Sequence, residues 1–355
     1  MGVEQDLVRH LVECRFEDMR LLTAVPICDG HDAAINTINL EFVRAGFEVV
    51  YLGYHRSARD IVRAAIQEDV RAIGLSSYNG GHIEFFAEVI DLLRKQKAGH
   101  IGVFGGGGGT ITPADARIMQ RKGVDRIFFA GTPLAEMVEF VKHRYAKPHK
   151  TCWKPAGKSS GPIIGVTGPG GAGKTTLIDE LVLRCLTANP CARIGILSHD
   201  PSIVGKGALL GDRAQMIYSQ DDRVFMRSLA TRGQAGGLAG ETGTWLRRFK
   251  RGGFDLIFVE TVGVGQEAAP FADGLVDKSV LVMSPEYGAR LQLQKIAMLD
   301  VASVVVISKS DLAGARTAAA EIGERLGTNQ KLLTTCAKRH RDAGVDELFG
   351  LLNYP

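Results

Sequence analysis

The chain has 355 residues, of which 45% are hydrophobic and 23% charged, values usual for globular proteins that fold in water. The net charge of +4 is too small to predict a nucleic-acid partner, and no run predicts a membrane span or a signal peptide. The six cysteines show no C-x-x-C spacing, so we expect a reduced, cytoplasmic protein without disulfides or zinc. The length predicts two or three domains.

Short apolar runs alternate with helical patterns through the first part of the chain. The predicted strands cover residues 21–28, 47–53, 71–77, 101–104 and 126–130. The predicted helices cover residues 32–46, 58–69, 83–95, 113–122 and 134–143. Such alternation predicts parallel strands joined by crossover helices, and these units fit a flavodoxin-like α/β domain of strand order 2-1-3-4-5 over residues 1–146.

A linker is predicted over residues 147–161, where prolines, glycines, lysines and serines replace apolar residues. A second α/β domain with a mainly parallel, doubly wound sheet is predicted over residues 162–355. Its predicted strands cover residues 163–167, 193–198, 224–227, 256–260, 279–283, 304–308 and 331–335.

The second domain opens with a phosphate-binding loop. Residues 168–176 match the template G-x-x-x-x-G-K-[ST] between a predicted strand and a predicted helix. In such a loop, backbone N–H groups close around phosphates, Lys174 reaches the terminal phosphates and stabilises developing charge, and the Thr175 hydroxyl is suited to Mg²⁺. The residues predicted to bind the nucleotide here are Gly171, Ala172, Gly173, Lys174, Thr175 and Thr176.

Three carboxylates are candidates for the Mg²⁺ site. Glu260 ends an apolar strand, while Asp200 and Asp212 follow the strand predicted over residues 193–198. We expect Glu260 to hold Mg²⁺ or its waters, with Asp200 and Asp212 completing the shell; alternatively, Asp200 only initiates a turn before a proline. Gln266, in the glycine-containing loop after Glu260, is the candidate for orienting the attacking water, and no catalytic base is evident.

The choice of base is predicted from a later segment. Residues 308–311 read Ser-Lys-Ser-Asp, the form of a guanine-specificity loop, Asn-Lys-x-Asp, with serine in place of asparagine. Asp311 would accept both N–H donors on the edge of guanine, and the Lys309 stem would lie against the ring. The backbone at Cys336 and Ala337 would donate to the guanine carbonyl. GTP is therefore favoured over ATP, with ATP-dependent kinase chemistry as the alternative.

Residues 162–312 resemble the MeaB/ArgK-type G-protein chaperones of cobalamin-dependent acyl-CoA mutases, by the phosphate loop and the acidic and base-binding motifs just described. The resemblance implies that Asp200, Asp212 and Glu260 surround Mg²⁺. Residues 284–295 are closer to the G domain of fused isobutyryl-CoA mutase, where they take the place of an additional switch loop. Slow GTP hydrolysis is expected of a switch that awaits its partner.

The first domain carries three loops suited to a ligand at the carboxyl ends of its predicted strands. The first loop holds Asp29, Gly30 and His31, and Asp29 is placed to accept the second ring N–H of His31 and raise its basicity. The loop after the third strand starts at Ser76. The loop after the fourth strand is the glycine run 105–109, which would clear side chains from a wide slot.

These loops resemble the cobalamin-binding domain of mutases in which a histidine replaces the dimethylbenzimidazole of the cofactor as lower cobalt ligand. The resemblance implies that His31 ligates cobalt and that Asp29 orients it. It also implies that Ser76 contacts the displaced tail of the cofactor and that Gly105 and Gly106 line the slot for that tail.

The chain departs from the family pattern at Ala34, where the pattern has glycine, and at Tyr78, where it has leucine. The order of cobalamin domain, linker and G domain is that of fused isobutyryl-CoA mutase, without the (β/α)₈ barrel. This resemblance implies a small mutase subunit fused to its chaperone, or a fragment of a longer fusion. It would bind adenosylcobalamin, GTP or GDP, and Mg²⁺, and work with a separate large subunit.

An adenosyltransferase and a second copy of the chain are further expected partners. A different reading stays open at this point, in which the chain is a cobalamin-dependent sensor or a cobalamin-trafficking GTPase without a role in a mutase.

Overall fold

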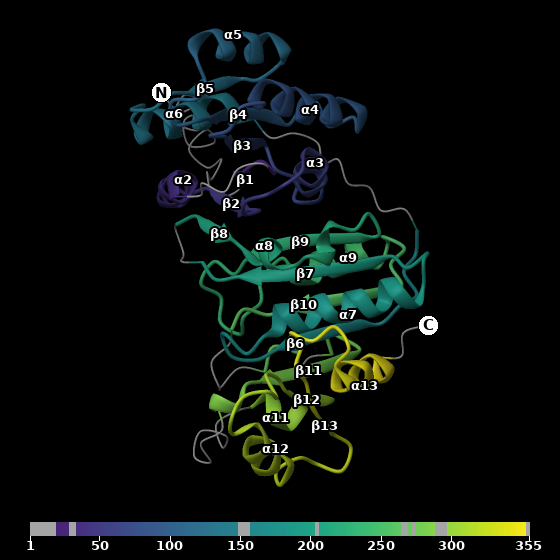
Figure 1. Ribbon diagram of the computed structural model, residues 1–355. Helices are drawn as coiled ribbons and strands as arrows, with labels where there is room; N and C mark the ends of the chain where they lie inside the picture. The colour runs from purple at the N-terminus through teal and green to yellow at the C-terminus, as the bar shows by residue number, and fades with distance from the viewer. Residues whose placement is uncertain are drawn as a thin grey trace, which may run out of the picture. The chain divides into compact units, whose positions relative to one another are not determined.

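The computed structural model of the protein contains two parallel β-sheets, each with helices on both faces (Figure 1). It describes residues 19–27, 33–147, 157–202, 206–263, 269–271, 274–287 and 297–352. The chain divides into two compact units, Met1–Cys152 with Ser202–Leu210 and Trp153–Pro201 with Gly211–Pro355. None of the helices in the described ranges is long and apolar enough to cross a membrane.

The first unit is built on a six-stranded parallel sheet of order β5-β4-β3-β1-β2-β8. The strands are β1 (Arg20–Ala24), β2 (Glu48–Tyr51), β3 (Ala72–Ser76), β4 (Gly102–Gly106), β5 (Arg126–Phe128) and β8 (Ala208–Leu210). The first five lie in the order 2-1-3-4-5, so the prediction of a flavodoxin-like sheet is confirmed. The strand order reverses between β1 and β3, which is where such sheets bind ligands.

Five helices cover the two faces of this sheet. They are α2 (Ala33–Arg44), α3 (Ala58–Gln67), α4 (His82–Lys95), α5 (Pro113–Lys122) and α6 (Leu134–Tyr145). Helix α2 contacts α6, while α4 contacts α3 and α5, so the helices form a layer of two and a layer of three (Figure 1). Side chains of Ser57 and Thr112 accept the N–H groups of Asp60 and Asp115 and so fix the starts of α3 and α5.

Strand β8 was not predicted, because its residues come from the middle of the range expected for the second domain. It runs parallel to β2, with the register pairs Glu48–Ala208, Val49–Leu209 and Val50–Leu210. The Gly207 N–H donates to the Val43 carbonyl at 3.0 Å, and the Ala208 N–H donates to the Phe47 carbonyl at 3.1 Å. A strand of three residues carries too little periodicity to be recognised in a sequence.

The second unit is built on a seven-stranded parallel sheet of order β13-β12-β11-β6-β10-β7-β9. Its strands are β6 (Ile163–Thr167), β7 (Ile194–Asp200), β9 (Val224–Ala230), β10 (Leu256–Glu260), β11 (Lys278–Met283), β12 (Val304–Ile307) and β13 (Lys331–Thr334). All seven correspond to predicted strands, and the doubly wound P-loop fold is confirmed. Strands such as β6 and β10 are buried throughout, as expected for a parallel sheet covered on both faces.

The helical elements of the second unit lie on both faces of its sheet. They are α7 (Lys174–Ala188), α8 (Asp212–Gln215), η2 (Tyr218–Gln220), α9 (Thr242–Phe249), η3 (Pro285–Tyr287), α11 (Met298–Val301), α12 (Ala315–Gly323) and α13 (Ala343–Leu351). Helices α7 and α13 pack together over one apolar core that includes Leu177 and Phe258. A second core, around Trp245 and Phe249, lies on the side of α9, α11 and α12.

Candidate nucleotide and cobalamin sites

The loop between β6 and α7 has the backbone of a phosphate cradle. Gly171 and Gly173 adopt left-handed φ angles of +73° and +91°, which side chains other than glycine rarely allow. No side chain of the described residues caps the start of α7, so its first N–H groups are available to an anion. A Cβ added at Gly170 or Gly171 would meet no described atom within 4 Å, so the loop is open on that side.

The side chains predicted for the terminal phosphates and for Mg²⁺ meet at the start of α7. Lys174 Nζ donates to the carbonyl oxygens of Gly168 at 3.0 Å and of Pro169 at 3.1 Å, so the ammonium lies across the loop. Burial lowers the pKa of Lys174. Thr175 Oγ1 donates to Glu260 Oε1 at 2.6 Å. The structure therefore brings the phosphate loop and the carboxyl end of β10 together, as predicted.

Glu260 lies deep beside this loop, with 2% of its surface exposed. Its second carboxyl oxygen, Oε2, has no hydrogen-bond partner in the described part of the chain. Burial, and then the nearby charge of Asp212, raises the pKa of Glu260 to about 8. Burial likewise raises the pKa of Asp212, whose Oδ2 accepts a hydrogen bond from Ser198 Oγ. A divalent cation would stabilise both carboxylates in their charged form, and the orphaned oxygen fits that role.

Asp200 lies at the end of β7 and closes a turn. Its Oδ1 accepts the Gly211 N–H at 3.2 Å, immediately before α8 starts at Asp212. The described residues include no group of three or more His, Cys, Asp or Glu side chains that could hold a metal ion by themselves. Magnesium beside a phosphate loop takes ligands from a hydroxyl, water and phosphates as well. Of the side chains expected around Mg²⁺, Thr175 and Glu260 are in direct contact with each other.

His199 is a central residue of this site that sequence analysis missed. Its Nδ1 lies 2.7 Å from the Glu260 carbonyl oxygen, and its Nε2 lies 2.8 Å from Thr242 Oγ1. Because a carbonyl oxygen only accepts, we assign the ring proton to Nδ1. Burial lowers the pKa of His199 to about 4, so the ring is neutral near pH 7. The only signal in the sequence was its position directly before Asp200.

The two segments predicted to bind the base lie side by side. The Ser310 N–H donates to the Thr335 carbonyl at 3.0 Å, and the Thr335 N–H donates to the Ile307 carbonyl at 2.8 Å. Cys336 Sγ donates to Asp311 Oδ1 at 3.3 Å, and this bond lowers the pKa of the exposed Asp311. The structure therefore brings Asp311 and Cys336 into contact at the edge of the sheet.

Ser308, which replaces the customary asparagine, is buried and joins this segment to the phosphate loop. Its Oγ lies within hydrogen-bonding distance of the carbonyl oxygens of Ala172 and Met283. The hydroxyl is thus used to hold the two nucleotide-binding segments together. Lys309, the next residue, has a φ of +51°, a strained angle for a residue other than glycine.

The loop after Glu260 starts against the phosphate loop. A Cβ added at Gly263 would lie 2.5 Å from the Gly170 nitrogen, so glycine is needed for this approach. The Val262 N–H donates to the Gly237 carbonyl at 3.1 Å, which connects a glycine-rich segment to the same loop. Gln266, predicted to orient water, lies outside the described residues.

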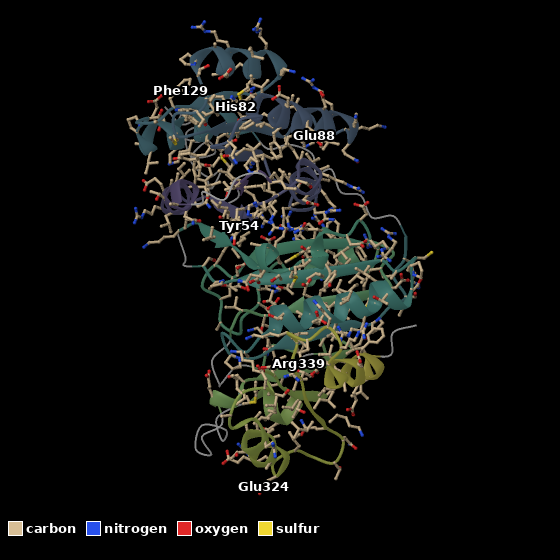
Figure 2. All side chains as sticks on the ribbon, viewed as in Figure 1. Tyr54, His82, Glu88, Phe129, Glu324 and Arg339 are labelled. Atoms are coloured by element: carbon tan, nitrogen blue, oxygen red, sulfur yellow. The ribbon has the colours of Figure 1, made fainter. Side chains whose placement is uncertain are left out.

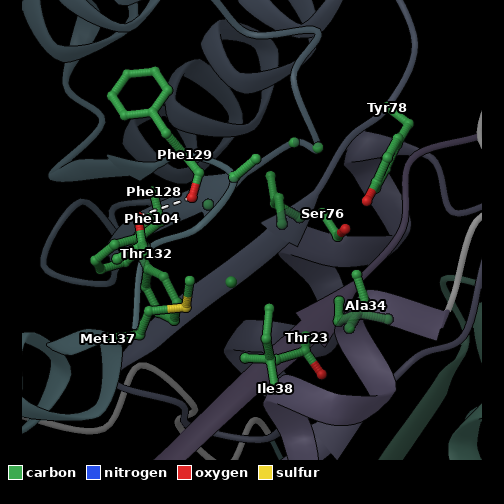
Figure 3. A pocket seen from close by; sticks show the side chains of 18 of the residues that line it. Thr23, Ala34, Ile38, Ser76, Tyr78, Phe104, Phe128, Phe129, Thr132 and Met137 are labelled. Atoms are coloured by element: carbon green, nitrogen blue, oxygen red, sulfur yellow. Dashed lines mark hydrogen bonds between the residues drawn. The ribbon is translucent and has the colours of Figure 1, made fainter. Parts of the chain in front are cut away.

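A cavity of about 170 Å³ opens at the carboxyl ends of the strands of the first sheet (Figure 3). Ser76, Gly105 and Gly106, which were predicted to hold the cofactor tail, all line it. The two departures from the family pattern, Ala34 and Tyr78, line it as well. The remaining predicted cofactor residues, Asp29, Gly30 and His31, lie outside the described residues.

The glycine run beside this cavity has a packing role in addition to the one expected. An added Cβ would lie too close to protein atoms: at Gly105, 2.4 Å from Leu75 O; at Gly106, 2.6 Å from Phe128 O; at Gly107, 1.9 Å from Ser77 O; at Gly108, 2.2 Å from the Tyr78 hydroxyl. These glycines therefore let the end of β4 approach β3 and β5, and the slot is bounded by backbone.

Large apolar side chains are exposed on the loops around this edge of the sheet. Ile27, Tyr54 and Phe129 follow β1, β2 and β5 and expose 52%, 52% and 39% of their surface; Figure 2 labels Tyr54 and Phe129. His55 Nδ1 lies 2.9 Å from the Ile27 carbonyl oxygen and so links two of the loops.

Two family models match the chain. The model described as methylmalonyl Co-A mutase-associated GTPase MeaB matches residues 142–348, more than half of the chain. The chain belongs to this family of mutase-associated GTPases. The model of the B12 binding domain matches residues 19–138, which contain the first five strands of the first sheet and the residues that line its cavity. The predictions of a GTPase domain and of a cobalamin-binding domain are therefore confirmed.

Relatives that match both the cobalamin-binding and the GTPase part of the chain include fused isobutyryl-CoA mutases. Over 93% of this chain, the identity is 37% to the protein of Cupriavidus metallidurans and 35% to that of Geobacillus kaustophilus. The matches cover 35% and 36% of those proteins, so the chain spans about a third of the length of these relatives. The methylmalonic aciduria type A homolog of Mus musculus is 41% identical over 42% of this chain and 35% of that protein.

Proposed function

We propose that the chain binds adenosylcobalamin for an acyl-CoA mutase of the isobutyryl-CoA mutase type and is fused to the GTPase that gates loading and removal of the cofactor. The rearrangement itself would take place on a separate large subunit. The observation that carries the proposal is the combination, in one chain, of a slot in a B12 domain and a P-loop with Thr175 against Glu260.

In the first domain, His31 would hold cobalt and Asp29, next to Gly30, would accept the second ring N–H. The tail of the cofactor would enter the cavity lined by Ser76, Gly105 and Gly106. The walls fit such a tail, because apolar side chains and bare backbone leave a narrow space for a flat ring. Bound adenosylcobalamin would supply the radical that starts the mutase reaction.

In the second domain, the phosphate loop with Lys174 would hold the phosphates, and Thr175 and Glu260 would hold Mg²⁺ with help from Asp200 and Asp212. Asp311 and Lys309, with the backbone of Cys336 and Ala337, would bind guanine. Gln266 would orient water for hydrolysis. Three observations support these roles: Lys174 lies across the phosphate loop, one carboxyl oxygen of Glu260 has no partner among the described residues, and Asp311 contacts Cys336.

The nucleotide would act on the loop that follows Glu260. A cation held by Thr175 and Glu260 would replace their direct hydrogen bond, and the phosphates would be bound by the loop against which Gly263 packs. Gating requires that GTP and GDP make different contacts with this loop. A ligand shifts the equilibrium between two conformations only by the difference between its affinities for them.

The cobalamin role is tested by the absorption spectrum of the bound cofactor. Wild-type protein should show cobalt ligated by histidine, and His31→Ala should lose that signature. An unchanged spectrum and unchanged binding in His31→Ala would contradict the role of His31. Co-purification with a mutase barrel, in the presence of adenosylcobalamin and a non-hydrolysable GTP analogue, tests the large subunit.

The base preference is tested by comparing GTP and ATP. Wild-type protein should bind GTP more tightly, and Asp311→Ala should lose most of the difference, on the order of a hundredfold, because the two N–H donors of guanine lose their acceptor. Equal binding of both nucleotides to wild-type protein would favour ATP-dependent chemistry instead.

A further inference from the structure

The residue that joins the base-binding segment to the phosphate loop has no hydrogen left for the base. Ser308 is 3% exposed, and its Oγ lies within hydrogen-bonding distance of two carbonyl oxygens, those of Ala172 and Met283. A hydroxyl carries a single hydrogen, and a carbonyl oxygen only accepts. Whichever of the two oxygens takes that hydrogen, Ser308 offers no donor to a bound ligand.

Position 308 lies between the groups proposed to hold the two ends of the nucleotide. On one side, Ser308 contacts Ala172, two residues before Lys174 in the phosphate loop. On the other side, three residues later in the chain, Asp311 would hold the N–H groups at the far edge of guanine. The ring nitrogen N7 of guanine is an acceptor in the half of the base that carries the sugar and phosphates. The side chain at position 308 is therefore on the side of N7.

A second hydroxyl next to this position has no partner. The Thr335 N–H donates to the Ile307 carbonyl at 2.8 Å, so Thr335 is opposite Ser308 where the pairing of β12 and β13 continues. Thr335 is fully buried, and its Oγ1 has no hydrogen-bond partner among the residues that the structure describes. Such hydroxyls are rare. Asparagine, the usual residue at position 308, carries an amide with two donor hydrogens and an acceptor oxygen, and serine supplies none of these beyond its one hydroxyl.

We propose that the base site recognises guanine without a hydrogen bond to N7, so that it takes 7-deazaguanine nucleotides as readily as guanine nucleotides. This inference rests on the proposed function, because it specifies how the same site recognises its base. Asp311 and the backbone at Cys336 and Ala337 would bind the N–H groups and the carbonyl, which 7-deazaguanine shares with guanine. Ser308 is therefore a specificity-determining residue that widens the class of guanine nucleotides bound.

The experiment compares two ligands that differ at one ring position. They are GDP and 7-deaza-GDP, in which a C–H group replaces N7, each with Mg²⁺. The proteins are the wild type, Ser308→Asn, which places an amide at this position, and Ser310→Asn, the same change two residues later. Ser310 is a matched control because its backbone N–H makes its contact with the Thr335 carbonyl. Calorimetry gives the ratio of the two dissociation constants for each protein.

We expect the wild type to bind the two nucleotides with affinities within about twofold of each other, because no hydrogen bond is lost with N7. Ser308→Asn should bind GDP about fivefold more tightly than 7-deaza-GDP, the usual effect of one neutral hydrogen bond, since its amide has a donor for N7. Ser310→Asn should keep the wild-type ratio. The ratio is the informative quantity, because a disturbed loop weakens the binding of both nucleotides alike.

A larger wild-type preference for GDP would mean that another group donates to N7, and it would overturn the inference without the use of any variant. An unchanged ratio in folded Ser308→Asn, or an equal gain in Ser310→Asn, would overturn the role of residue 308. Wild-type protein that binds neither nucleotide, or that binds ADP as tightly as GDP, would overturn the proposed guanine site, and this inference with it.

Discussion

His199 connects three segments at the nucleotide site through its two ring nitrogens. It is the next-to-last residue of β7, it donates to the last residue of β10, and it contacts Thr242 at the start of α9. Thr242 Oγ1 also lies 2.6 Å from the Ala239 carbonyl oxygen, which brings a further loop into the same set of contacts. The contacts alone do not set the protonation state, because the Thr242 hydroxyl can accept as well as donate a hydrogen bond. The burial of His199 requires a neutral imidazole.

This requirement predicts a pH dependence of stability. Burial lowers the pKa of His199 to about 4, below the ordinary imidazole value of 6.5, so the unfolded chain binds the additional proton between these values. The contribution to the free energy of unfolding is therefore complete above about pH 6.5 and falls, by up to ~3 kcal/mol, as the pH approaches 4. Denaturant unfolding followed by the fluorescence of buried Trp245 measures it.

The matched variants are His199→Asn and His143→Asn, since His143 is an exposed residue of α6. The stability difference between the wild type and His199→Asn should be largest near pH 7 and shrink toward pH 4. His143→Asn should show no such trend. A difference for His199→Asn that is the same at every pH would contradict the assignment of a neutral ring.

Residues whose role follows from local spacing could be predicted, and those whose role depends on a distant partner could not. Lys174 and Thr175 are positioned by the loop in which they lie, so the motif was enough. His199 gave no comparable signal, because the Glu260 carbonyl that defines its role is brought to it by another strand.

At the scale of elements, an ion-pair cluster fixes the start of the first sheet. Arg20, on β1, donates to Glu48 of β2 at 2.6 Å and to Glu68, which follows α3, at 2.9 Å. All three side chains are buried. Removing one partner from such a cluster leaves buried charge without compensation, and this is more harmful than the loss of an exposed ion pair.

Arg20→Met is therefore expected to lower the free energy of unfolding of the first unit by about 3–5 kcal/mol. The matched control is Arg44→Met, which removes an exposed pair with Glu41 on α2 and should change stability by less than about 1 kcal/mol. Denaturant unfolding of both variants gives the comparison. Similar small effects for both would mean that Arg20 contributes only packing.

The strand order, like the helix or strand type of each element, could be predicted from the sequence. Each strand–helix unit of ordinary length carries its own hydrophobic pattern, and right-handed crossovers leave few ways to arrange parallel strands. The partner of β2 at the sheet edge could not be predicted, because β8 lies far away in the sequence and is only three residues long.

At the scale of the molecule, β8 joins the chain of one unit to the sheet of the other. The segment leaves the second unit after Pro201, pairs with β2, and returns at Gly211. Asp200 and Asp212, which flank this excursion, are proposed Mg²⁺ ligands. A cation and nucleotide bound there would act on both ends of the segment that contains β8.

Gly207 permits this pairing. A Cβ added at Gly207 would lie 2.1 Å from the Phe47 carbonyl oxygen, so Gly207→Ala should displace β8 from β2 and speed amide exchange in residues 206–210 at least about tenfold. Gly211→Ala is the control, since an added Cβ there would meet no described atom within 4 Å. Equal exchange in the two variants would contradict a role for Gly207 in the pairing.

The nucleotide should also change this exchange. Adding Mg²⁺ and a GTP analogue to the wild type is expected to alter exchange in residues 206–210 by about twofold or more, because Asp200 and Asp212 would move as they bind the cation. Gly207→Ala should lose most of this response. An unaltered exchange rate in the wild type would contradict an effect of the bound nucleotide on β8.

The excursion through β8 also limits how the protein can be divided for study. A fragment that stops in the linker would lack residues 206–210, and β2 would then present a bare row of N–H and carbonyl groups at the edge of the sheet. Such an edge invites pairing with another copy, so truncated cobalamin-domain fragments should be prone to self-association. A peptide of this sequence, supplied in trans, would be the natural means of capping them.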